Sequence, residues 1–182
     1  MPEANHEQHR RGLRSLVREV AGAVDATGLE LMGLLRMVAN QVESAVDEHL
    51  SVDGLSGPRW ALLLRLLVEE RRSDQEWASP THLSRSQSVS KNTISALLRG
   101  LEDQGLIERT LDPADKRAFR ISLTETGRRL LIASAPGHIA FLNDLASPLT
   151  IEERTQLIHL LSKLHRSLPP RERWLESDPE HA

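Results

Sequence analysis

Apolar residues recur every three to four positions along most of the chain, which is the spacing of amphipathic helices. The pattern predicts a first helix over residues 10–26 and a second over residues 29–50, with a break at Gly28. The second helix carries an apolar stripe that we expect to be buried against a partner. The stripe consists of Leu31, Leu35, Val38, Val42 and Val46.

Three further helices are predicted between Pro58 and Gly105. The first starts at Pro58, a residue suited to an opening turn, and runs to about residue 72. After a polar loop at residues 73–78, Ser79-Pro80 has the order of an N-cap and a first helical residue, so it opens a short helix. Ser90 caps a longer helix, which Gly105 ends.

The apolar period changes from 3.6 to 2 after Gly105, as expected for β-strands. Two runs alternate apolar and polar positions, at residues 107–111 and 119–123, and a turn-rich segment at residues 112–116 separates them. This pattern predicts a β-hairpin with a polar tip.

Two helices are predicted after the hairpin. Thr124 caps the first, which runs to about residue 146 and is disturbed at Pro136-Gly137. A capping box at residues 150–153 opens the last helix, which Pro169-Pro170 ends. The predicted fold class is mainly α with a small β-hairpin, in the order of a winged helix-turn-helix.

The predicted helix from Ser90 to Gln104 has two opposite faces. One face is apolar and anchors the helix to the core, whereas Asn92, Ser95 and Arg99 lie on the other. Asn and Arg side chains form paired hydrogen bonds with adenine and guanine edges, and the first turns of a recognition helix enter the major groove. A solvated helix face without a ligand is the alternative interpretation.

Hydroxyl and basic groups flank this face. Lys91, the helix N-terminus and nearby hydroxyls, including those of Thr81, Ser84 and Ser86, suit phosphate contacts, and the basic hairpin tip suits the minor groove. A solvated turn is the alternative for the tip. The predicted DNA-contacting residues are Ser88, Ser90, Lys91, Asn92, Ser95, Arg99, Lys116 and Arg117.

The formal net charge is -3, so the charge of the whole chain does not indicate a nucleic-acid partner. Between residues 85 and 129, however, the sequence contains nine Lys and Arg residues and six Asp and Glu residues. The basic charge is therefore modestly concentrated around the predicted DNA-binding elements.

Several function classes are disfavoured by composition. The chain has no cysteine, which excludes disulfides, thiolate metal sites and thiol redox sensing. It has no Gly-rich phosphate loop or nucleophile elbow, so we expect no enzyme. It also has no apolar signal region at its start and no long apolar run, so we expect a cytoplasmic protein without a membrane partner.

Three segments together resemble the MarR family of transcription regulators: residues 101–109 (LEDQGLIER), residues 115–117 (DKR) and residues 123–127 (LTETG). The resemblance covers about residues 29–168 and implies a triangular homodimer with interlocked terminal helices. It places Arg117 in the minor groove and gives Asp115, through a charge-assisted bond, and Arg109 supporting roles in the hairpin. A symmetric dimer is expected to repress transcription by reading a palindrome with half-sites about 10 base pairs apart.

This interpretation divides the chain into four parts. Residues 1–28 are expected to form an N-terminal helical extension, and residues 57–124 the winged helix-turn-helix domain. Residues 29–56 and 125–168 are expected to form the helical dimerisation region. Residues 169–182 are expected to form a flexible tail.

Members of this family are commonly released from DNA by a small ligand, here expected to be aromatic or anionic. The residues expected to line a pocket for it are Arg36, Met37, His49, Trp60 and Arg65. For Trp60 the alternative is a core position, and for both arginines it is a surface charge. No resident cofactor or metal is predicted.

Two alternative functions remain. The first is a winged-helix module for protein–protein contacts, for which Asn92, Arg99 and Arg117 would be dispensable. The second is a regulator that responds to divalent metals, because imidazoles and carboxylates suit zinc. Its candidate groups are Glu43 with Glu48-His49, and His159 with His165.

Overall fold

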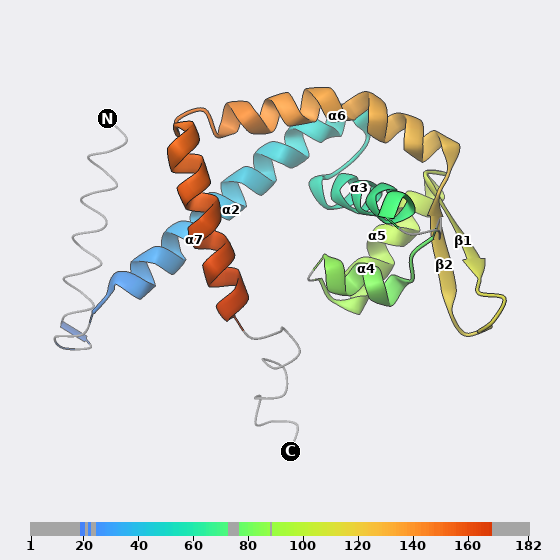
Figure 1. The fold of residues 1–182 in the computed structure, drawn as a ribbon, viewed down its shortest axis with the longest axis horizontal. Helices are drawn as coiled ribbons and strands as arrows, with labels where there is room; N and C mark the ends of the chain where they lie inside the picture. The colour runs from blue at the N-terminus through green and yellow to red at the C-terminus, as the bar shows by residue number, and fades with distance from the viewer. Residues whose placement is uncertain (1–18, 21, 23–24, 73–76, 88, 169–182) are drawn as a thin grey trace, which may run out of the picture. The chain divides into compact units, whose positions relative to one another are not determined.

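The computed structural model describes residues 19–20, 22, 25–72, 77–87 and 89–168 (Figure 1). Most of the predicted helix at residues 10–26, Ser88 and the predicted tail at residues 169–182 lie outside the described residues. The chain divides into two compact units, Met1–Ala45 and Val46–Ala182, which are described separately.

Helix α2 (Thr27–Leu50) begins earlier than predicted, and its last residues, 46–50, belong to the second unit. Gly28 lies inside it, so the predicted break at this residue is wrong. The first N–H groups of a helix have no intrahelical acceptor, so a glycine in this first turn removes little stability from the helix. The Asp25 carboxylate instead accepts a hydrogen bond from the Thr27 N–H at 3.0 Å. Most of the apolar stripe of α2 is exposed in the single chain, Leu31 and Val38 by about half, whereas Val46 is partly buried against the core of the second unit.

In the second unit, the 3-10 turn η1 (Ser51–Asp53) leads to three helices, α3 (Gly57–Arg72), α4 (Pro80–Ser86) and α5 (Lys91–Asp103). Their two predicted serine caps are confirmed. The Ser79 Oγ accepts from the His82 N–H at 3.2 Å, and the Ser90 Oγ accepts from the Thr93 N–H at 3.0 Å. The three helices share one apolar core, which includes Leu63, Leu66, Leu83, Leu98 and Leu101.

The predicted hairpin is present as antiparallel strands β1 (Ile107–Leu111) and β2 (Phe119–Leu123). Gly105, at φ 67°, makes the left-handed turn that connects α5 to β1. Ala78, which was predicted to lie in a polar loop, is buried and exchanges two 2.9 Å backbone hydrogen bonds with Ile121. The prediction was wrong there because the pairing partner is far away in the sequence.

Helix α6 (Glu125–Leu145) follows the hairpin, and Thr124 caps it as predicted. Pro136 lies inside α6 without ending it. A Cβ atom on Gly127 would stand 2.0 Å from the Leu106 carbonyl oxygen, so only glycine allows α6 to start this close to the hairpin. The predicted capping box at Thr150 and Glu153 opens helix α7 (Ile151–Ser167).

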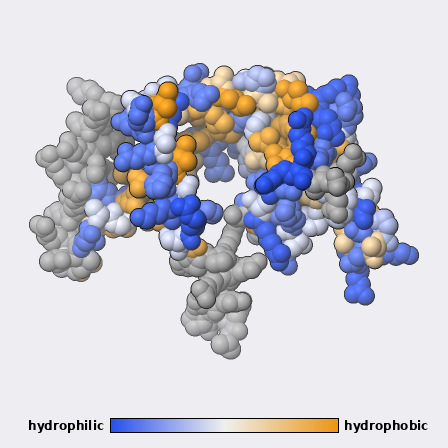
Figure 2. Space-filling view, viewed as in Figure 1, coloured by the Kyte–Doolittle hydropathy of each residue, from blue (hydrophilic) through white to orange (hydrophobic). Residues whose placement is uncertain are grey.

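Helix α7 has no buried residue, although its sequence carries an apolar stripe. Figure 2 shows apolar surface on the part of the molecule where α7 lies. The exposed apolar residues of this helix include Leu157, Ile158, Leu160 and Leu161. Among the described residues, no helix is both long and apolar enough to cross a membrane.

Candidate nucleic-acid interface

The two faces of α5 are those expected from its sequence. Ile94, Leu98 and Leu101 are buried, whereas Asn92 and Arg99 are exposed. Neither of these exposed side chains has a hydrogen bond or ion pair with another described residue, so both are available to a ligand.

Two residues of this exposed face have small side chains that project little from the helix. Ala96 and Ser95 are exposed, and the Ser95 hydroxyl donates to the Lys91 carbonyl oxygen at 2.8 Å. This bond folds the hydroxyl back on its own helix and leaves oxygen lone pairs as acceptors. Lys91 is exposed at the first turn of α5, where the helix end carries partial positive charge.

The turn between α4 and α5 is fixed by a reciprocal pair of hydrogen bonds. The Ser84 hydroxyl donates to the Val89 carbonyl at 2.8 Å, and the Val89 N–H donates to the Ser84 carbonyl at 3.2 Å. Ser84 is buried, so the expectation that its hydroxyl faces a phosphate is wrong. The hydroxyl positions α5 against α4 instead.

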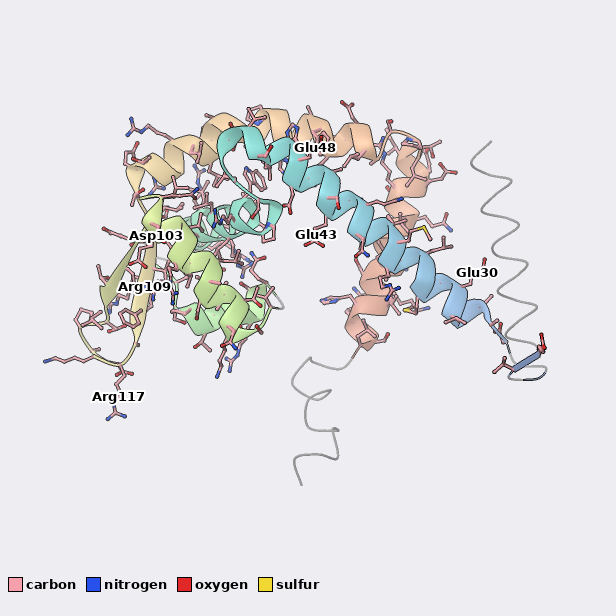
Figure 3. The ribbon with its side chains drawn as sticks, turned by 180° about the vertical axis from the view of Figure 1, so that it is seen from behind. Glu30, Glu43, Glu48, Asp103, Arg109 and Arg117 are labelled. Carbon is pink, nitrogen blue, oxygen red and sulfur yellow. The ribbon has the colours of Figure 1, made fainter. Side chains whose placement is uncertain are left out.

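The hairpin tip presents two basic residues. Lys116 and Arg117 are exposed, and Figure 3 shows Arg117 pointing away from the protein. The Asp115 carboxylate accepts from the backbone N–H of Arg117 at 3.0 Å, in place of the charge-assisted bond to the guanidinium implied by the family resemblance. A short aspartate side chain readily bonds the N–H two residues on, which closes the turn. The guanidinium of Arg117 has no partner among the described residues.

A second aspartate organises the hairpin, and the sequence analysis missed it. The Asp112 carboxylate accepts from the Ala114 N–H at 2.8 Å and from Arg120 through two bonds of 3.0 and 3.1 Å. The guanidinium of Arg120 lies 4.4 Å from the ring centroid of Trp77. The hydrogen bonds from Arg120, and then the one from Ala114, lower the pKa of Asp112.

Arg109 supports the base of the hairpin. Its Nε lies 3.2 Å from a carboxylate oxygen of Glu102 on α5, and its guanidinium lies 5.4 Å from the ring centroid of Phe119. Strand β1 is thereby tied to both α5 and β2.

Two of the predicted pocket residues meet in a ring cluster. His49 stacks on Phe141 with centroids 4.1 Å apart and planes 3° apart, and Trp60 lies 4.4 Å from His138. The Trp60 Nε1 donates to the Ser134 hydroxyl at 3.0 Å. His138 and Phe141 on α6 were not identified from the sequence, where nothing connects them to His49.

His138 is the unusual member of this cluster. It is 4% exposed, and its Nδ1 has no hydrogen-bond partner among the described residues. Burial, and to a lesser degree the charge of His49, lowers the pKa of His138. A buried imidazole with a lowered pKa stays neutral near pH 7 and offers one donor and one acceptor.

The other predicted pocket residues have different surroundings. Arg65 forms an ion pair with Glu69 at 2.6 Å, and Glu69 also meets the His82 Nε2 at 3.2 Å. The hydrogen bond from His82 is the main reason that the pKa of Glu69 is lowered. Arg36 and Met37 are exposed on α2 in the first unit. Among the described residues, no group of three or more His, Asp or Glu side chains is arranged to hold a metal ion.

Comparison with known proteins finds similarity to one family of transcription regulators. A model of the MarR family, MarR_2, matches residues 53–118, which include α3, α4, α5 and β1. The S. aureus MepR–DNA complex has a chain of the same fold, with a TM-score of 0.67 and 27% identity over 75% of this chain and 97% of MepR. The chain is thus similar to the MarR family over its helix-turn-helix segment, and its fold is that of MepR.

Two transcription regulators are similar to the chain along most of their length. The transcriptional repressor YetL of Bacillus subtilis is 28% identical over 82% of this chain and 87% of YetL. The transcriptional regulator PecS of Dickeya dadantii is 27% identical over 80% of this chain and 86% of PecS. Both relatives are named as HTH-type transcription regulators.

Proposed function

We propose that the protein is a MarR-type regulator that binds double-stranded DNA sequence-specifically, as a homodimer on a palindromic operator, and represses transcription. The observation that carries the proposal is the pairing of two unengaged basic groups, Arg99 on α5 and Arg117 at the hairpin tip, on consecutive elements of one winged helix-turn-helix. The function places the protein with the chromosome, in the cytoplasm.

The available side chains divide the work of recognition. Asn92 and Arg99 are the residues that read bases in the major groove, because both can bond one base edge at two points. Lys91 and the cap residue Ser90 lie at the helix N-terminus, where phosphate is favoured. Arg117, with Lys116 beside it, reaches the minor groove, whose negative potential attracts a guanidinium.

A homodimer is supported by the apolar residues that the single chain leaves in water. Helix α7 buries no residue, and Leu160 is 52% exposed. Burying apolar surface stabilises by about 25 cal/mol per Å², so a helix of this composition favours a partner. A second copy of the chain supplies one with the same composition.

The effector that regulates the protein is a small planar aromatic, with an anionic or phenolic group, that binds at the ring cluster. In this proposal the ligand inserts between rings that now contact one another, His49 with Phe141 and Trp60 with His138. The unpartnered Nδ1 of His138 then suits a hydrogen bond with a polar substituent. In this proposal the apolar surroundings supply affinity and His138 supplies orientation.

Salicylate is a suitable probe for the effector site. A ligand that binds only the native state raises the unfolding temperature. We expect salicylate to raise the melting temperature of the wild type and to leave that of His138→Ala unchanged. An equal shift in both proteins would place the binding elsewhere.

The experiment for DNA binding is a salt-dependent gel shift on the DNA upstream of the protein's own gene. Each phosphate contact contributes about -0.9 to the slope of log affinity against log salt, so a steep slope is expected. Arg117→Ala should weaken binding, whereas Arg129→Ala, at an exposed position on α6, is the matched control. Unchanged binding in Arg117→Ala, Arg99→Ala and Asn92→Ala would favour the protein–protein module instead.

A further inference from the structure

We propose that Trp77, Arg120 and Asp112 form a clamp that holds the hairpin tip where Arg117 contacts DNA. These three side chains, called the wing clamp below, are positioning residues that act through Arg117. The inference rests on the proposed DNA-binding function of the hairpin.

The first link of the wing clamp joins the turn to strand β2. The carboxylate of Asp112, at the start of the tip, accepts two hydrogen bonds from Arg120 and one from the Ala114 N–H inside the turn. A two-point bond between a guanidinium and a carboxylate fixes angle as well as distance. One carboxylate therefore holds both the conformation of the tip and its direction relative to β2.

The second link joins β2 to the helical body. The guanidinium of Arg120 lies 4.4 Å from the ring centroid of Trp77, within the range of a cation–π contact. Trp77 immediately precedes Ala78, which is buried and bonded to Ile121, the neighbour of Arg120, through two backbone bonds. The indole is thus held beside β2 by the backbone that leads into α4.

Apolar packing contributes little to the outer half of the hairpin. Ile107 and Leu123, which face each other at its base, are buried. Leu111 and Phe119, which face each other next to the tip, are 55% and 38% exposed. A two-stranded hairpin without a core is marginally stable in water. The wing clamp replaces that missing core with directional polar contacts.

A fixed tip matters because binding to DNA orders the side chains that contact the DNA. A mobile arginine loses conformational freedom when it enters a groove, and this loss reduces the affinity. If the wing clamp removes that cost in advance, its effect on affinity requires the Arg117 contact. The two contributions must then be non-additive.

The test is a double-mutant cycle between Trp77 and Arg117, measured as dissociation constants for an operator selected from random DNA. Trp77→Leu keeps apolar bulk without a π face, and we expect it to weaken binding about two- to fivefold. Trp77→Phe should restore most of the affinity. In the Arg117→Ala background, Trp77→Leu should have almost no further effect.

Two additional measurements separate positioning from loss of the fold. Ser122→Ala removes the 3.2 Å bond between Ser122 and Glu108 on the same hairpin, outside the wing clamp, and should leave affinity unchanged. Hydrogen exchange without DNA should be faster at residues 114–118 in Trp77→Leu and in Arg120→Lys, while the core helices stay protected.

Two results would overturn the wing clamp: no loss of affinity in Trp77→Leu, or the same loss in both backgrounds. Equal operator binding by the wild type and Arg117→Ala would instead contradict the proposed role of the hairpin, and the wing clamp with it. Operator binding that depends on Arg117 but not on Trp77 would leave the proposed function standing.

Discussion

Two aspartates of the hairpin, Asp112 and Asp115, have different structural roles. Asp115 bonds the backbone of Arg117, whereas Asp112 bonds both the turn and the guanidinium of Arg120. The difference follows from position, because Asp112 begins the turn and faces back along β2. The exposed face of α5 was predictable from helical spacing alone, but the partner of Asp112 was not, since spacing within a strand does not name a cross-strand partner.

His138 makes the free energy of unfolding depend on pH. Its pKa is lowered in the native state, so near and below the ordinary value of 6.5 the unfolded chain binds a proton more readily than the native chain. The free energy of unfolding should therefore decrease as the pH falls below about 6.5, and the decrease should stop below the native pKa. Urea denaturation across this range measures the effect.

A matched pair of variants assigns this pH dependence. His138→Phe removes the titrating group from the ring cluster and should flatten the decrease. His159→Gln, at an exposed position on α7, should retain the wild-type profile. The assignment fails if His138→Phe and the wild type lose the same free energy over the same pH range.

At the scale of elements, most local signals predict the structure, Gly28 being an exception, whereas pairings between distant residues are not predicted. The caps at Ser79, Ser90, Thr124 and Thr150 and the hairpin depend on residues a few positions apart, and all are present. The pairing of Ala78 with Ile121 joins two residues that are separated by α4, α5 and β1 along the chain. Composition at Ala78 gave no sign of this pairing.

The ring cluster, like the Ala78 pairing, depends on residues that are far apart in the sequence. Its members come from α2, α3 and α6, so no window of sequence contains them together. His49 and Trp60 were predicted as pocket residues, but their contacts with His138 emerge only when the helices pack. The sequence did contain one usable hint for the wing clamp: Trp77 is one of three tryptophans in a chain with few aromatics.

At the scale of the whole molecule, most of the apolar stripe predicted for α2 is exposed in the single chain. The apolar residues Leu157, Ile158, Leu160 and Leu161 of α7 are exposed as well. Soluble proteins rarely leave large apolar patches without a use. A symmetric dimer covers the same patch on both subunits and presents two copies of α5 and the hairpin to DNA.

Selection from a random pool of double-stranded DNA tests the central claim most directly, that α5 and the hairpin of a dimer read bases. The account predicts an enriched inverted repeat with half-site centres about one helical turn, roughly 10 base pairs, apart. Arg99→Ala should lose preference at one position of each half-site, at a cost of about 1–3 kcal/mol. Enrichment of no sequence, or of the same repeat with equal preference by Arg99→Ala and Asn92→Ala, would contradict it.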